Sequence, residues 1–130
     1  MHERKGNPNT VMVIDDDPSI LITVKSILEP EGFEVVTVDS GKACIQKLQT
    51  GFHGVLLLDI MMPHMDGWDT IREIVGKGLL PGNVISMLTA KDVPDAKMDG
   101  LQQYVTDYIT KPFEPERLIG AVEEYLSYLE

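Results

Sequence analysis

The chain has one cysteine, few basic residues and no long apolar run. Cys44 stands alone, so an intramolecular disulfide and a cysteine zinc cluster are excluded, which fits a reducing cytosol. The 11 Lys and Arg stand against 21 Asp and Glu, and the net charge of −10 repels nucleic-acid phosphates and anionic lipid headgroups. Because no apolar run approaches the ~18 residues of a membrane helix, we expect a cytoplasmic domain that binds neither nucleic acid nor membrane directly.

Aromatic residues are also scarce, at 6% of the chain, whereas apolar residues make up 43%. The core should therefore be aliphatic, built on Val, Ile and Leu. At 130 residues the chain has the size of one domain. We expect a polar leader over residues 1–9, which lacks the apolar stretch of a signal peptide, and a single domain over residues 10–130 with no repeat or linker.

Short apolar runs alternate with helical stripes from Thr10 onward, which is typical of βα units around a parallel sheet. The run Val11–Ile14 indicates a central strand covered on both faces. Asp17 provides an N-cap and Pro18 a first helical residue. The other expected strands are residues 33–38, 55–59, 84–88 and 108–109. The expected helices are residues 18–28, a helix capped by Ser40 and running through Leu48, the region of 71–75, a short and poorly specified segment between Val93 and Leu101, and residues 118–129.

Polar side chains stand where these strands end. Asp15 and Asp16 follow the first strand, Asp59 ends the third, Thr89 ends the fourth, and Lys111 follows the fifth. Parallel strands bring their carboxyl ends to one edge of a sheet, where open α/β sheets bind ligands. We therefore expect these five side chains to converge. Charges gathered at such an edge are costly unless they hold a ligand, so the chemistry of the chain should lie there.

The residue types at this edge suit phosphoryl transfer. Asp15, Asp16 and Asp59 offer hard oxygen ligands without histidine or thiolate, which favours Mg²⁺ or Mn²⁺ over zinc. Lys111 adds a positive charge, and Thr89 adds a hydroxyl. Phosphoryl transfer to a carboxylate needs a nucleophile in line, a divalent ion and donors around the equatorial oxygens. Asp59, in the middle of the set, is the natural nucleophile.

Four segments resemble the receiver domains of two-component response regulators, a family that includes chemotaxis receivers. These segments are Val13–Pro18, Leu57–Gly67, Met87–Ala90 and Asp107–Phe113. They stand in the order of the family and span nearly all of the chain. The resemblance implies an α/β fold of the flavodoxin-like kind, a doubly wound five-stranded parallel sheet of order 2-1-3-4-5 with five helices.

The resemblance also implies roles for the site residues. Asp59 would accept a phosphoryl group from the phosphohistidine of a sensor histidine kinase or phosphotransfer protein. Asp16, Asp59 and the backbone carbonyl of Met61 would hold Mg²⁺, with Asp15 acting mainly through water. Lys111 would neutralise phosphoryl oxygens. The domain would catalyse only its own phosphorylation and dephosphorylation, so we expect a signalling protein and not an enzyme.

A switch surface is implied as well. Thr89 would rotate inward to bond a phosphoryl oxygen, and Tyr108 would move with it. The surface formed by the helix between Val93 and Leu101, the fifth strand and the last helix would then change and regulate a downstream output protein or domain. A phosphorylation-dependent homodimer through the last helix and strand is left open.

Several smaller expectations accompany the resemblance. Lys111–Pro112 looks like the cis peptide of the family. Tyr104 stands where many members have glycine and tolerates a left-handed turn poorly, so this loop should differ. Met61, Met62 and Met65 should pack within their loop.

Two alternatives remain. A magnesium-dependent phosphatase of the haloacid dehalogenase type also uses an aspartate nucleophile after a buried strand, but it needs a second aspartate two residues later as acid and base, where this chain has Met61. A phosphorylation-independent docking module predicts loss of acidic-pocket or lysine residues, yet all of them are present.

Overall fold

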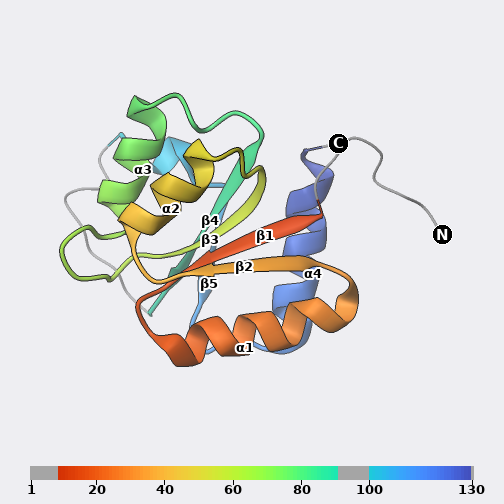
Figure 1. Ribbon diagram of the computed structural model, residues 1–130. Coiled ribbons are helices and arrows are strands. Elements are labelled where there is room, and N and C mark those ends of the chain that lie inside the picture. The colour runs from red at the N-terminus through yellow and green to blue at the C-terminus, as the bar shows by residue number, and fades with distance from the viewer. Residues whose placement is uncertain (1–8, 91–99, 130) are drawn as a thin grey trace.

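A computed structural model describes residues 9–90 and 100–129 of the chain. Its five strands form one parallel sheet in the order β2-β1-β3-β4-β5 (Figure 1). The strands are β1 Thr10–Ile14, β2 Glu34–Val38, β3 Gly54–Asp59, β4 Asn83–Thr89 and β5 Asp107–Thr110. The predicted fold class and strand order are therefore confirmed.

Helices cover both faces of this sheet. They are α1 Pro18–Leu28, α2 Gly41–Gln49, α3 Gly67–Gly76 and α4 Pro115–Ser127. Figure 1 shows α2 and α3 against one face, with α1 and α4 against the other. None of the helices in the described part of the chain has the length and apolar character needed to cross a bilayer.

The described residues hold four α-helices, where five were predicted. The helix expected between Val93 and Leu101 falls mainly on residues 91–99, outside the described part of the chain. A short 3₁₀ helix, Gln102–Tyr104, follows it. Tyr104 thus lies in a right-handed turn, and the left-handed residue of this region is Gly100 at φ 78°.

Local side-chain contacts explain where the helices begin. The Asp17 carboxylate accepts a hydrogen bond from the Ser19 backbone N–H at 2.9 Å, as expected of an N-cap. The Ser40 hydroxyl accepts one from the Ala43 N–H at 3.1 Å and caps α2. At α3, Asp66 and Asp69 form a reciprocal capping box. The predicted starts of α1 and α2 are confirmed.

The core is largely aliphatic, as predicted. Strands β1 and β3 alternate between the two faces: Met12, Ile14, Leu56 and Leu58 pack beneath α2 and α3, whereas Val11, Val13, Val55 and Leu57 pack beneath α1 and α4. Burying each such side chain contributes about 1.5–3 kcal/mol. Cys44 is fully buried on α2, as a small apolar residue would be. Two aromatic side chains, Trp68 and Tyr125, are also almost fully buried.

The prediction for the methionine loop is wrong in one respect. Met62 is buried and Met65 is partly buried against the core, but the Met61 side chain is 69% exposed. Met61 therefore projects into solvent two residues beyond Asp59. The predicted cis peptide at Lys111–Pro112 is present.

Candidate functional site

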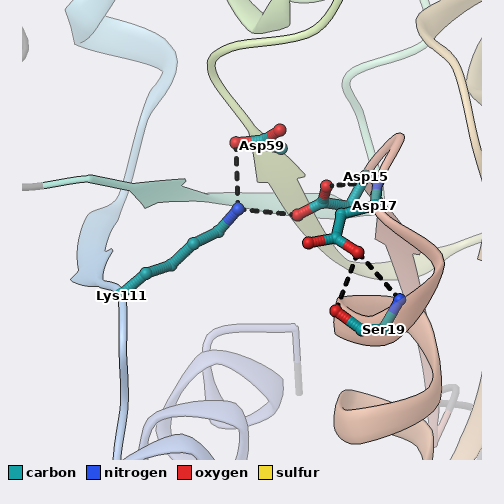
Figure 2. Close-up of polar contacts among 5 residues, drawn as sticks. All are labelled: Asp15, Asp17, Ser19, Asp59 and Lys111. Atoms are coloured by element: carbon teal, nitrogen blue, oxygen red, sulfur yellow. Dashed lines mark hydrogen bonds and ion pairs between the residues drawn. The ribbon is translucent and has the colours of Figure 1, made fainter.

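The carboxylates that end the first and third strands come together at one edge of the sheet. Carboxylate oxygens of Asp15, Asp16 and Asp59 all lie within 4.8 Å of one another. The Lys111 ammonium reaches between two of them and donates to Asp15 Oδ2 at 2.8 Å and to Asp59 Oδ1 at 3.2 Å (Figure 2). These four side chains come from three separate stretches of the sequence. They meet at one place, as predicted from their positions at the ends of strands.

Backbone contacts hold these residues in place. The Asp15 backbone N–H donates to the Val38 carbonyl at 3.2 Å, and Asp15 Oδ1 accepts from the Asp17 N–H at 2.9 Å. The Lys111 N–H donates to the Thr89 carbonyl at 2.8 Å, which fixes the start of the Lys111 side chain beside β4. The Asp15 carboxylate is therefore oriented by its own chain before any ligand arrives.

Gly67 allows the loop after β3 to fold back on the site. Its N–H donates to the Ile60 carbonyl at 2.8 Å. A Cβ at this position would lie 2.6 Å from the Asp59 carbonyl oxygen and 2.9 Å from the Ile60 Cα, both backbone atoms that cannot rotate away. Glycine is thus required here by close backbone approach, and the approach brings the N-terminus of α3 beneath Asp59.

The site carries an excess of negative charge. The Asp15 and Asp59 residues are only 1% and 5% exposed, whereas Asp16 is exposed. Burial, followed by the repulsion of Asp15, raises the pKa of Asp59 to about 6, although Lys111 acts in the opposite direction. Burial would lower the pKa of Lys111, but its bonds and charge interactions with the two carboxylates raise it above the ordinary value. One ammonium therefore faces three carboxyl groups, an arrangement that attracts a cation.

Thr89 and Met61 contribute less directly to this cluster. Thr89 is 8% exposed at the end of β4, and its hydroxyl donates to the Ala90 carbonyl at 2.6 Å. Within the described residues, no hydrogen bond joins it to the carboxylates. The Met61 backbone N–H acts to lower the pKa of Asp59 and so favours the charged form of its carboxylate. Tyr108, on β5, is 41% exposed.

A polar cluster at the start of β5 was not predicted from the sequence. Ser86, Asp107, Arg117 and Tyr125 are joined by hydrogen bonds and an ion pair. Tyr125 lies within the predicted helix of residues 118–129, and the sequence alone gives its hydroxyl no partner. Ser86 was the available signal, because a hydroxyl in the middle of a buried strand needs a partner.

The family model of the response regulator receiver domain matches residues 11–123 of this chain. The chain belongs to this family. The solved structure of a CheY-like response regulator receiver domain protein from Methanospirillum hungatei is 55% identical to this receiver domain, with a TM-score of 0.89, and the match covers 92% of this chain and 95% of that one. The resemblance read from the four segments is thereby confirmed.

Curated relatives include longer regulators and a protein of similar length. The alkaline phosphatase synthesis transcriptional regulatory protein PhoP of Bacillus subtilis is 34% identical over 116 residues, which cover 89% of this chain and 48% of PhoP. Protein PilG of Pseudomonas aeruginosa is 32% identical over 124 residues, which cover 95% of this chain and 92% of PilG. The chain spans about half the length of the first three curated relatives it matches.

Membership of the family sets the general role of this receiver domain. Receiver domains of two-component response regulators act in signalling and interact with histidine kinases and output domains. The family binds Mg²⁺ at an acidic pocket, and this chain has the matching aspartate cluster.

Proposed function

We propose that this receiver domain is a phosphoacceptor switch of a two-component system, working in the cytoplasm. Asp59 takes a phosphoryl group from the phosphohistidine of a sensor histidine kinase or phosphotransfer protein, and a downstream output protein or domain reads the result. The observation that carries this proposal is the meeting of the Asp15, Asp16 and Asp59 carboxylates within 4.8 Å, with Lys111 bonded to Asp15 and Asp59.

The donor set fits a magnesium ion, with Mn²⁺ as the substitute. Asp16, Asp59 and the Met61 carbonyl would hold the ion, with Asp15 acting mainly through water. Three carboxyl groups without histidine or thiolate are the ligands that hard divalent cations prefer. When bound, the ion supplies charge that stabilises the phosphoryl oxygens.

The residues of this chain perform the transfer as follows. A carboxylate oxygen of Asp59 forms a bond to phosphorus as the bond from phosphorus to the histidine nitrogen breaks, and the imidazole leaves with the electron pair. At pH 7 Asp59 is mostly ionised because its pKa is about 6. Lys111, already bonded to Asp59 Oδ1, lies where it can neutralise the incoming oxygens. Water later hydrolyses the acyl phosphate and resets the domain.

Thr89 and Tyr108 are the proposed switch residues. Among the described residues, the Thr89 hydroxyl bonds only to the adjacent Ala90 carbonyl, so rotation toward a phosphoryl oxygen exchanges one acceptor for another. Tyr108 is 41% exposed and can change position at modest cost in packing. The resulting change on β5 and α4 would be read by the output partner, or by a second copy in a phosphorylation-dependent homodimer.

Labelling with acetyl phosphate tests the proposed function. The protein should gain the mass of one phosphoryl group when Mg²⁺ is present and none when the metal is chelated, and peptide mapping should place the group on Asp59. The phosphatase alternative predicts many turnovers of p-nitrophenyl phosphate instead, and the docking alternative predicts no label. Because Met61 supplies no acid or base, we expect hydrolysis of external esters to be negligible.

Addition of Mg²⁺ to the metal-free protein should stabilise the folded state. A ligand that binds only the folded state adds about 2.7 kcal/mol at a concentration a hundred times its dissociation constant. Thermal unfolding at pH 7 should therefore shift upward as Mg²⁺ is titrated in. Asp16→Asn should reduce this shift, whereas Asp39→Asn, a matched charge change at an exposed loop of the same sheet edge, should not. A melting temperature that ignores Mg²⁺ would count against the metal site.

A further inference from the structure

A chain of hydrogen bonds ties α4 to strands β4 and β5. The Ser86 hydroxyl donates to the Tyr125 hydroxyl at 3.0 Å, and the Tyr125 hydroxyl donates to Asp107 Oδ2 at 2.7 Å. Arg117, two turns earlier on α4, lies 3.6 Å from the same carboxylate oxygen. The Asp107 Oδ1 atom accepts from the Tyr108 backbone N–H at 2.8 Å. The Asp107 carboxylate, at the start of β5, thus contacts two side chains of α4, Tyr125 and Arg117.

Two hydroxyl groups of this chain of hydrogen bonds are buried, so breaking their bonds would cost stability. Ser86 and Tyr125 are 0% and 1% exposed, and a buried hydroxyl that loses its partner costs about 1–3 kcal/mol. Burial raises the pKa of Tyr125, so its hydroxyl remains a donor at neutral pH. Burial opposes ionisation of Asp107, but the bond from Tyr125 and the Tyr108 N–H lower its pKa overall. A slide or rotation of α4 would therefore break the buried bond between Ser86 and Tyr125, which water cannot easily replace.

Strand β5 connects this cluster to the acidic site. Asp107 is its first residue, and Lys111 directly follows its last residue, Thr110. At about 3.3 Å per residue, the two ends lie roughly 13 Å apart. β5 is an edge strand that, among the described strands, pairs only with β4, with Asp107 beside Ser86 and Thr110 beside Thr89. A short edge strand held at both ends by side chains can shift as a unit when either end is pulled.

We propose that the Tyr125 hydroxyl, held between Ser86 and Asp107, is a positioning contact that makes α4 follow the Lys111 end of β5. The inference rests on the proposed function, because the pull on Lys111 is supplied by the phosphoryl group on Asp59. Tyr125 does not touch the reacting atoms. Its role is to convert a displacement of β5 into a displacement of the helix, and the labelling chemistry should not depend on it.

The test compares two tyrosines of the same helical end. Beryllium fluoride with Mg²⁺ serves as a stable stand-in for the phosphoryl group, and amide chemical shifts are recorded for the full chain. In Tyr125→Phe, the shift changes at Thr89 and Lys111 should persist, while those along α4 should fall roughly 2- to 10-fold. Tyr128→Phe is the matched control, because Tyr128, the residue that directly follows α4, is 54% exposed and among the described residues its hydroxyl bonds only to Glu124. It should respond like the unmodified chain.

The readout is the ratio of the α4 response to the response at the site, which simple destabilisation does not change. An unchanged ratio in Tyr125→Phe would overturn the inference. If that variant fails to fold, Ser86→Ala removes the donor on β4 without altering the helix, and it must also lower the ratio for the inference to survive. Absence of any response at Lys111 in the unmodified chain would instead refute the proposed function, and the coupling would fall with it. Asp107→Asn, which keeps an oxygen acceptor, should retain more of the α4 response than Asp107→Ala.

Discussion

Asp59→Asn should abolish Mg²⁺-dependent labelling by acetyl phosphate and, in the metal-free protein at pH 7, raise the free energy of unfolding. The amide cannot attack phosphorus, so labelling is lost. The gain in stability arises because Asp59 is 5% exposed and faces the Asp15 carboxylate. A pKa raised from 3.8 to about 6 corresponds to a penalty on the order of 2–3 kcal/mol for the ionised form.

The pKa of Asp59 determines at which pH the substitution Asp59→Asn raises the free energy of unfolding. The folded chain binds the Asp59 proton more tightly than the unfolded chain, since its folded pKa is about 6 and its ordinary value 3.8. The stability that this proton contributes is fully present below pH 3.8 and is lost as the pH rises through about 6. Asparagine, which never ionises, should therefore stabilise the protein relative to Asp59 at pH 7 and bring little gain near pH 4.

Urea unfolding at both pH values and mass spectrometry check the two halves of this prediction. Asp39→Asn removes a carboxylate from an exposed position at the same sheet edge and should leave both labelling and stability nearly unchanged. Aspartyl labelling that persists in Asp59→Asn would refute the phosphoacceptor assignment. An equal stability difference at pH 4 and pH 7 would refute the electrostatic explanation.

The site could be predicted from sequence because its charged residues stand at the ends of apolar runs that form the strands. Asp15 and Asp59 directly follow or end unbroken apolar runs, and a charge there has no role in packing. Parallel topology then forces such residues to one edge, whatever their separation in the chain. The helix starts were predictable for a similar reason, since the Asp17 and Ser40 caps act on backbone groups only two or three residues away.

Long-range side-chain contacts were not predictable in the same way. Tyr125 fits the apolar stripe of α4 and is indeed buried, but its hydroxyl partners lie 39 and 18 residues away on β4 and β5. Which strand residues it meets depends on how α4 is set against the sheet, which periodicity does not specify. The exposed side chain of Met61 was missed because an apolar residue in a loop carries no pattern that fixes its direction.

Lys111→Met should destabilise the metal-free protein at pH 7 by about 3 kcal/mol. Methionine keeps much of the apolar stem but leaves the Asp15 and Asp59 carboxylates facing each other without the ammonium that bonds both. Protonation of Asp59 relieves the repulsion, so the loss should shrink toward pH 5. Added Mg²⁺ should also restore stability, because a divalent ion replaces the missing charge. Labelling should slow without vanishing, and the response of α4 should weaken.

Two further variants separate repulsion at the site from the general loss of an ion pair. Lys25→Met removes a cation whose partner, Glu29, lies 4.0 Å away with both side chains about half exposed, and it should cost at most about 0.5 kcal/mol. The double variant Lys111→Met with Asp59→Asn leaves a single buried carboxylate and should recover most of the stability lost in Lys111→Met. Additive effects of the two substitutions in urea unfolding would show that Lys111 acts through packing and not through the Asp59 charge, which would remove the electrostatic basis of the site.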